Sequence, residues 1–192
     1  MRFGTLGGAH SNHALVLHRY LSFHGVQGAA VTLYENFCSA FAALADGELD
    51  YVLQCSVHPE HSRLSGQYLC RVHPVDGFIA SSRPLGILTR ADVDEPRRLG
   101  LQPATRDYAD LSAWSEFVEE PSTTAVAEGL LAGRYESGLT FVDLLESHPG
   151  RFRMTADIGS VTDVWVLFAA APLPCVDLVA WPNAPVRDRF SE

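Results

Sequence analysis

Two short segments rich in histidine, serine and threonine each follow a turn and precede a helical pattern. The first is Gly7-Gly8-Ala9-His10-Ser11-Asn12-His13 and the second is Pro121-Ser122-Thr123-Thr124-Ala125. The first N–H groups of a helix lack partners within it and lie at the positive end of its dipole, so they favour an anion. Together the segments predict a cleft that grips a small acid with carboxylates at both ends. A structural turn and a simple N-cap are the respective alternatives.

Two polar side chains follow a predicted buried strand that ends at Cys55. Ser56 and His58 come directly after it, and ligands of open α/β sheets bind at the carboxyl ends of the strands. Both residues are therefore candidates for the wall of the cleft. His58 and His61 lie three residues apart, but neither a predicted helix nor a carboxylate at matching spacing accompanies them, so no metal site is expected.

A third polar segment, residues 102–108, carries one arginine. Arg106 can hold a carboxylate as a bidentate fork, because its guanidinium presents paired N–H groups. A surface ion pair with Asp107 or Asp110 is the alternative. Gln102, at the start of the segment, is a further substrate-binding candidate. The chain has no G-x-S-x-G motif and no Ser-His-Asp order, which argues against a hydrolase.

The charged residues exclude several classes of protein. The 192-residue chain has 14 cationic side chains, 23 acidic side chains and a formal net charge of -9. Every cation is an arginine. Without lysine the chain can form neither a Schiff base nor a P-loop nucleotide site. The acidic balance argues against nucleic acid as a partner, since phosphate binding depends on clustered cations. An anionic ligand must be held by arginine, hydroxyl, histidine or backbone N–H groups.

The cysteines and the apolar runs bear on the location of the protein. Cys38, Cys55, Cys70 and Cys175 form no C-x-x-C pair, so free thiols in a reducing cytosol are expected. The N-terminus has no apolar run of signal-peptide length, and no stretch approaches the ~20 apolar residues of a membrane span. We therefore expect a cytoplasmic protein with no membrane partner.

The elements that must position these side chains begin with alternating strands and helices. We predict strands at Arg2–Leu6, Ala29–Leu33 and Leu49–Cys55 from their apolar patterns. A helix containing Leu15, Val16 and Tyr20 separates the first two strands. An alanine-rich helix, Phe37–Ala45, separates the second and third, with Asn36 as its N-cap. This βαβαβ order predicts a parallel sheet with helices on its faces.

The pattern changes after residue 71. Two apolar runs, Gly77–Ala80 and Pro84–Leu88, resemble a crossing between lobes. The charged stretch Asp92–Gly100 is expected to be a solvated loop. Ala104–Phe117 and Ala125–Ala132 are expected to be helices.

The last third of the chain returns to the first lobe in this interpretation. Val164–Phe168 is predicted to be a strand, and the proline-punctuated tail from Pro172 to Pro185 is expected to pack on a lobe. The fold class is therefore α/β, with two lobes of parallel or mixed sheets around a central cleft. Lobe 1 combines residues 1–80 with 157–192, and lobe 2 spans residues 81–156.

The order of these motifs resembles prephenate dehydratase and its relatives, the prephenate decarboxylases of bacilysin-type antibiotic pathways. The family motif L-G-P-x-G-T-x-S lies over Leu6–His13 without a gap, so Ser11 falls on its threonine and His13 on its serine. The family's S-T-x-A falls on Ser122–Ala125. The colinearity, which includes the matching segments Leu33–Phe37, Gly47–Val52 and Pro84–Ile87, extends from about Phe3 to Phe168.

Two departures from the dehydratase pattern bear on the reaction. Gln54–His58 stands where a dehydratase usually has P-I-E-N-S, and Thr162–Phe168 stands where it has T-R-F. The Trp-x-Leu-Phe ending looks more like the decarboxylases. The regulatory ACT domain of many dehydratases is not expected here. The resemblance implies the dehydratase catalytic-domain fold, which is periplasmic-binding-protein type II-like, and a homodimer.

The resemblance and its departures imply a cofactor-free, non-aromatising decarboxylase of prephenate or a close analogue in specialised metabolism. Its ligand would be a small dicarboxylate. The catalytic candidates are His13, His10 and His58; the substrate-binding candidates are Ser11, Ser56, Gln102, Arg106, Ser122, Thr123 and Thr124. Neither a metal nor a cofactor is expected. Three alternatives stay open: a prephenate dehydratase that gives phenylpyruvate, a lyase of another cyclic acid in a tropolone-type pathway, and a non-catalytic small-acid-binding protein.

Overall fold

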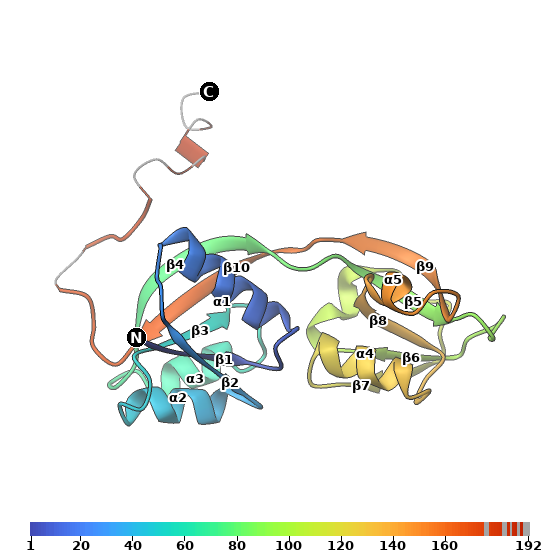
Figure 1. Ribbon diagram of the computed structural model, residues 1–192, viewed down its shortest axis with the longest axis horizontal. Helices are drawn as coiled ribbons and strands as arrows, with labels where there is room; N and C mark the ends of the chain where they lie inside the picture. The colour runs from blue at the N-terminus through green and yellow to red at the C-terminus, as the bar shows by residue number, and fades with distance from the viewer. Residues whose placement is uncertain (175–176, 182–183, 185, 188, 190–192) are drawn as a thin grey trace.

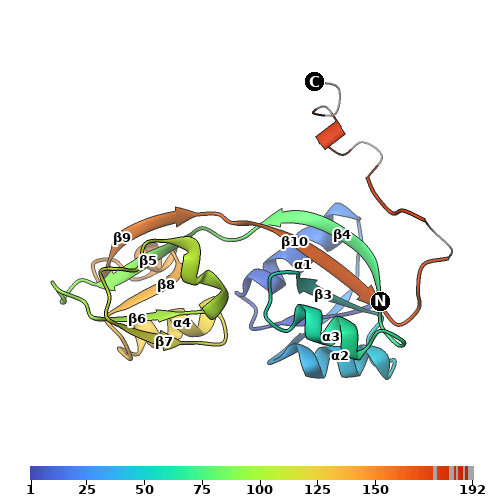
Figure 2. The same cartoon turned by 180° about the vertical axis from the view of Figure 1, so that it is seen from behind.

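The chain forms two α/β lobes, each built on a five-stranded mixed sheet (Figures 1 and 2). This computed structural model describes residues 1–174, 177–181, 184, 186, 187 and 189. The two-lobed α/β fold predicted from the sequence is confirmed. Among the described residues, no helix is both long and apolar enough to cross a membrane.

The sheet of the first lobe has the strand order β2-β1-β3-β10-β4. Strands β1 (Arg2–Leu6), β2 (Ala30–Tyr34) and β3 (Tyr51–Cys55) are parallel, as their βαβαβ order requires. Strand β10 (Thr162–Ala169) returns from the distant C-terminal part and inserts antiparallel between β3 and β4 (His73–Ser81). The sheet is therefore mixed. In the sequence, β4 comes before the second lobe and β10 comes after it.

Helices cover both faces of this sheet. Helix α1 (Asn12–Phe23) packs on one face, where Phe3, Leu53 and Trp165 are buried with it. Helices α2 (Phe37–Ala45) and α3 (His61–Gln67) lie on the other face. The carboxyl ends of the parallel strands, where α1 and the segment after β3 begin, point toward the second lobe (Figure 1).

The sheet of the second lobe has the order β7-β6-β8-β5-β9. Its strands are β5 (Leu85–Arg90), β6 (Arg98–Leu101), β7 (Glu116–Glu119), β8 (Ser137–Phe141) and β9 (Phe152–Gly159). Helices α4 (Thr123–Leu131) and α5 (Leu144–Ser147) pack on one face around Leu88 and Val126. The opposite face packs around Ile87, Leu99 and Trp114.

Two chain segments connect the lobes side by side. One leads from β4 to β5, and the other leads from β9 to β10 (Figures 1 and 2). They are joined where the Ser82 N–H donates to Val161 O at 2.8 Å and the Val161 N–H donates to the Ser82 hydroxyl at 3.0 Å. The lobe division at residues 80 and 157 stays a prediction, although these crossings lie close to it.

The predicted helix over Ala104–Phe117 is wrong. A 3-10 helix occupies only Pro103–Tyr108, and the segment ends in strand β7. Apolar side chains of this segment, including Tyr108, Leu111 and Trp114, pack against the sheet without helical spacing. Helical periodicity was the wrong criterion here, because an irregular loop buries the same residues by following the sheet surface.

The predicted solvated loop over Asp92–Gly100 is also wrong at its end. Residues from Arg98 onward form β6, in which Leu99 and Leu101 are fully buried. Gly100 lies between them, and a Cβ there would come within 2.2 Å of the Tyr135 ring. Strand β6 therefore needs a glycine at this position, because the Tyr135 ring lies directly against its backbone. The charged residues that precede Arg98 made this strand hard to recognise in the sequence.

Candidate functional site

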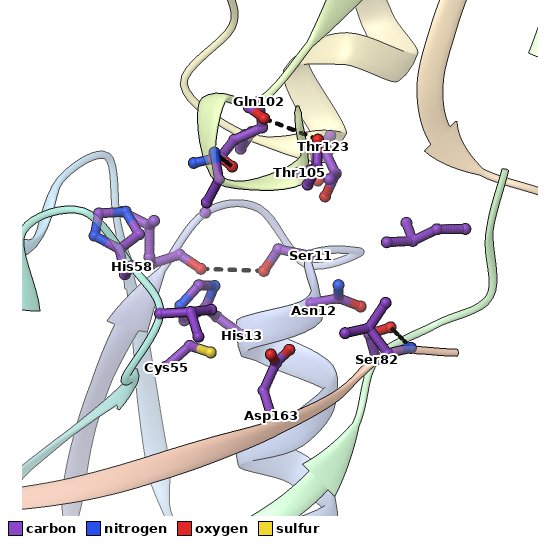
Figure 3. Close-up of a pocket in the computed structure, with 18 of the residues that line it drawn as sticks. Ser11, Asn12, His13, Cys55, His58, Ser82, Gln102, Thr105, Thr123 and Asp163 are labelled. Carbon is purple, nitrogen blue, oxygen red and sulfur yellow. Dashed lines mark hydrogen bonds between the residues drawn. The ribbon is translucent and has the colours of Figure 1, made fainter. Parts of the chain in front are cut away.

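A cavity lies between the two lobes and is lined from both (Figure 3). Its empty volume is about 740 Å³, counting space open to solvent. The lining residues with polar side chains are Ser11, Asn12, His13, Cys55, His58, Ser82, Gln102, Thr105, Tyr108, Ser122, Thr123, Thr124 and Asp163, together with Trp165. The starts of α1 and α4, predicted separately from the sequence, thus border the same space.

The start of α1 is fixed by a glycine turn and a serine cap. Gly7 has a φ of 90° and its N–H donates to Tyr34 O at 2.8 Å. The hydroxyl of Ser11 accepts from the Ala14 N–H at 3.1 Å and donates to Leu6 O at 3.0 Å. Because that hydroxyl is already engaged twice, the donors left for a ligand are the N–H groups of the first turn, at Asn12 and His13.

The start of α4 has the same construction. The Ser122 hydroxyl accepts from the Ala125 N–H at 3.0 Å, and the first N–H bonded within the helix is that of Val126. The N–H groups of Thr123 and Thr124 precede it. The Thr124 hydroxyl is buried and has no hydrogen-bond partner within the described chain. A buried hydroxyl without a partner is costly unless a ligand or water satisfies it.

Of the cavity-lining residues, His13 also has a buried polar atom without a hydrogen-bond partner. Its Nε2 atom makes no hydrogen bond to any described residue. The ring is held edge-on between Phe37 and Trp165, with centroids 5.2 and 5.0 Å away. Burial, reinforced by the neighbouring His58, lowers the pKa of His13 to about 3. The imidazole is therefore neutral near pH 7, and its Nε2 can form one hydrogen bond with a ligand.

His58 continues the wall next to His13. The two ring centroids are 6.1 Å apart, and the His58 Nδ1 accepts from the Glu60 N–H at 3.2 Å. Burial lowers the pKa of His58 as well. His61 lies at the start of α3, where its Nδ1 is 3.0 Å from Gln54 Oε1. Among the described residues, no group of three or more His, Cys, Asp or Glu side chains has an arrangement that would hold a metal.

Three of the sequence candidates lie outside this cavity. The backbone carbonyl of His10 accepts from Arg83, which holds that loop to the second lobe. Ser56 uses its N–H to continue the sheet, donating to Val164 O at 2.9 Å. The Arg106 guanidinium stacks over the Phe117 ring at 4.5 Å. None of the three side chains is among the lining residues.

The other seven candidates line the cavity. They are His13, His58, Ser11, Gln102, Ser122, Thr123 and Thr124. The Gln102 Oε1 accepts from the Ala104 N–H at 2.8 Å and so caps the 3-10 helix. The side chain of Gln102 therefore shapes the roof of the cavity in Figure 3.

Several lining residues were missed from the sequence. Asp163 is the most important of them, because it is half-buried and burial raises its pKa. It precedes Trp165 by two positions in β10, so the alternation of a strand puts both side chains on the face that α1 covers. That spacing was the available signal. Cys55, Thr105 and Tyr108 also line the cavity, but nothing in their spacing distinguishes them.

The electrostatics of the cavity are unusual for an acid-binding site. Its described lining includes no arginine, and the sequence has no lysine. Two arginines directly follow lining residues in sequence, and both are engaged elsewhere. Arg83 pairs with Asp143 and packs over Phe141, and Arg106 stacks over Phe117. Positive potential inside the cavity must therefore come from the two helix starts.

Cys38, Cys55 and Cys70 are free thiols, whereas Cys175 lies outside the described residues. Cys55 lines the cavity, and burial raises the pKa of its thiol to about 12. It is therefore a protonated thiol at neutral pH, unsuited to act as a nucleophile.

Comparisons with known proteins relate the fold to two groups. No family model matches the chain, and no curated protein matches it. A prephenate dehydratase from Arthrobacter aurescens, solved in complex with L-Phe, matches 94% of this chain with a TM-score of 0.64 and 16% identity. This chain spans 63% of the length of that one. The fold of the present chain is thus prephenate dehydratase-like.

The second group includes an ABC transporter protein and a periplasmic domain. An ABC transporter protein from Parabacteroides distasonis matches all of this chain and 69% of its own, with a TM-score of 0.56 and 13% identity. The periplasmic VFT2 domain of BvgS from Bordetella pertussis matches 88% of this chain and 80% of its own, with a TM-score of 0.55 and 14% identity. At these identities the likeness concerns the fold alone.

Proposed function

We propose that this chain is a cofactor-free lyase that removes carbon dioxide from prephenate, or from a close cyclic analogue, and leaves the ring non-aromatic. One observation carries the proposal. The starts of α1 and α4, from different lobes, border one cavity that also contains two buried polar atoms without partners, His13 Nε2 and Thr124 Oγ1. The prephenate dehydratase-like fold and the colinear motifs support the choice of substrate class.

A cyclic acid with carboxylates at opposite ends fits between the two helix starts. The free donors are the first-turn N–H groups of α1, at Asn12 and His13, and those of α4, at Thr123 and Thr124. The Thr124 hydroxyl adds a further donor. Because no arginine or lysine lines the described cavity, these neutral donors must hold the acid, and the loss of any one should weaken binding measurably.

The reaction is defined by what happens to the electron pair that carbon dioxide leaves behind. Prephenate carries a ring carboxylate, a pyruvyl side chain and a ring hydroxyl. If the hydroxyl departs, the ring becomes aromatic, and a general acid must protonate the leaving oxygen. If a ring carbon takes a proton instead, the ring stays non-aromatic and keeps its hydroxyl. We assign the second course, because Thr162–Phe168 replaces the T-R-F segment of dehydratases.

The candidate residues take different roles in this proposal. Ser11 and Ser122 fix the two helix starts, since their hydroxyls already cap the helices. His13 is a neutral hydrogen-bond partner for the acid, and His58 is a polar wall beside it. His10, Ser56 and Arg106 receive no role at the substrate, because their side chains do not line the cavity.

A specific observation favours one competing function, a non-catalytic small-acid-binding protein. Two of the structural neighbours are a periplasmic VFT2 domain and an ABC transporter protein, and the cavity has the same interlobe position that a binding protein needs. Tight binding of prephenate without turnover would favour this alternative. The dehydratase differs from our proposal in the product formed, and the tropolone-type lyase differs in the cyclic acid on which it acts.

Proton NMR of purified protein mixed with prephenate separates these functions. The decarboxylase predicts loss of the ring carboxylate, with vinylic ring protons and the hydroxyl-bearing carbon retained. An aromatic phenylpyruvate spectrum above the protein-free control would establish the dehydratase and refute the decarboxylase. An unchanged prephenate spectrum would refute both enzymes for this substrate.

The cytoplasmic location, the place in antibiotic biosynthesis and the homodimer stay predictions, since they follow from the sequence and its resemblance.

A further inference from the structure

Among the described residues that line the cavity, Asp163 is the one with a carboxylate side chain. It lies near the start of β10, where its backbone pairs with Ala80 of β4. In Figure 3 its side chain rises from β10 toward the space between His13 and Ser82. The carboxylate therefore faces the same volume as the unpartnered Nε2 of His13.

No fixed cation compensates this carboxylate. In the part of the chain that the structure describes, Asp163 makes no hydrogen bond and no ion pair with its side chain. Burial alone raises its pKa. The groups that face it from the neighbouring elements are His13 of α1, Cys55 of β3 and Tyr108 of the 3-10 helix, and none of these carries a charge near pH 7.

A bound acid makes the charged form of Asp163 still less favourable. A carboxylate ligand in this cavity, whose described lining includes no arginine, brings a like charge close to Asp163, and a like charge raises the pKa of a carboxyl. Two anions without a cation between them cannot both stay ionised at low cost. Binding of the acid is therefore coupled to uptake of a proton by the cavity.

We propose that Asp163 is the group that takes up this proton when the acid binds and then delivers it to the substrate ring. The delivery step rests on the proposed function. The bond between the ring and the departing carboxylate breaks, and its electron pair moves through the ring double bonds. A ring carbon forms a C–H bond with the proton of Asp163, which becomes a carboxylate. After the product leaves, Asp163 stays a carboxylate and takes its next proton from water when the next acid binds, so no oxidant or reductant is consumed.

The other titratable groups in the cavity are poorer donors. The pKa of His13, at about 3, and that of His58, which burial lowers, leave neutral imidazoles with no acidic proton to give at pH 7. Burial raises the pKa of Cys55 to about 12 and also raises that of Tyr108. A general acid works best when its pKa lies near the working pH, and of these groups only a carboxyl raised by burial and by a bound anion approaches that condition.

Calorimetry of prephenate binding tests the proton uptake without relying on turnover. Titrations at pH 7 in two buffers of different ionisation enthalpy give the number of protons taken up per acid bound. We expect close to one for the wild type and for the remote control Asp94→Asn, and close to zero for Asp163→Asn. Asp163→Glu keeps a carboxyl at the site and should restore part of the uptake. Uptake that is absent in the wild type, or unchanged in Asp163→Asn, would overturn the proposal.

Turnover of the same variants tests the delivery step. Asp163→Asn should lose about 10²–10⁴-fold in kcat, the usual worth of a general acid, while its affinity for prephenate is retained or improved because a like charge is gone. A kcat and pH profile equal to those of Asp94→Asn would refute delivery by Asp163. A third outcome is possible, in which the wild type takes up the proton through Asp163 but forms no product. That outcome would refute the decarboxylase and support only the protonation of Asp163 on binding.

Discussion

The imidazole of His13 packs edge-on against the indole of Trp165, with centroids 5.0 Å apart and ring planes at 75°. His13 belongs to the first turn of α1, whereas Trp165 belongs to β10, more than 150 residues later in the chain. This contact joins the start of α1 to the strand that carries Asp163. The wall of the cavity thus depends on β10 returning from the second lobe.

Thr124→Val should separate function from stability. Valine has nearly the shape of threonine but no hydroxyl, and the Thr124 Oγ1 is buried without a partner. Its removal should leave Tm unchanged or raise it, because an unsatisfied buried group is lost. The affinity for prephenate should fall about five- to tenfold, the worth of one hydrogen bond of about 1 kcal/mol. Calorimetry and thermal unfolding measure the two effects.

The matched comparison is Ser122→Ala. That change removes a helix cap, so it should cost about 1 kcal/mol of unfolding free energy. If Thr124→Val lowered Tm as much as Ser122→Ala and left affinity unchanged, the hydroxyl would be a structural group and not a ligand donor.

His13 should make the protein less stable in acid. Its pKa in the folded protein is about 3, below the ordinary value of about 6.5 in the unfolded chain. Between these values the unfolded state binds more protons, so the unfolding free energy falls as the pH falls from about 6.5 toward 3, by at most about 1.4 kcal/mol per pH unit from this group. The contribution is fully present above pH 6.5.

His13→Phe removes this titration and keeps a ring in the same position. Urea unfolding at pH 7.5, 5.5 and 4.5 should therefore give a shallower loss of unfolding free energy for His13→Phe than for the wild type. Parallel curves for the two proteins over that range would contradict a neutral, buried His13. Some slope should persist in the variant, because burial lowers the pKa of His58 too.

Arg106→Gln should leave the function intact. The guanidinium stacks on Phe117, outside the cavity lining. We expect the affinity for prephenate and kcat to stay within about twofold of the wild type, and the unfolding free energy to drop by about 0.5–1 kcal/mol through the lost cation–π contact. A tenfold or larger loss of affinity would mean that Arg106 reaches the ligand after all.

Gly100→Ala should destabilise the second lobe. A Cβ at this position would come within 2.2 Å of the buried ring of Tyr135, so the ring or the strand must move, at a cost of about 1–3 kcal/mol. Gly66→Ala is the control, because it lies in α3 with no atom within 4 Å of its Cβ and should be neutral or stabilising by up to about 1 kcal/mol. Equal midpoints in urea for the two variants would contradict the packing described for β6.

Local patterns predicted the first lobe well. The helix over Phe37–Ala45 begins and ends as expected, since Asn36 accepts from the Ser39 N–H and caps it. Strand β1 has its predicted bounds, Arg2–Leu6. These elements carry strong short-range signals, namely a cap, an apolar period and a glycine turn.

The parts that were not predicted depend on contacts between distant residues. The 3-10 helix and β7 form inside a segment whose apolar side chains have no regular period, because the sheet surface decides their positions. Contacts between distant residues also explain why part of the site was not predicted. Ser122–Thr124 and His13 are recognisable from helix-start signals, whereas Asp163 joins them only when β10 inserts between β3 and β4.

Prephenate turnover in D₂O, followed by proton NMR and mass spectrometry of the product, tests the central claim most directly. If the protein decarboxylates prephenate with a proton delivered from one side of the cavity, the product still shows vinylic ring protons and keeps its hydroxyl. It should also gain a single deuterium at one ring carbon with one stereochemistry. Phenylpyruvate without ring deuterium, or prephenate recovered unchanged, would contradict the account.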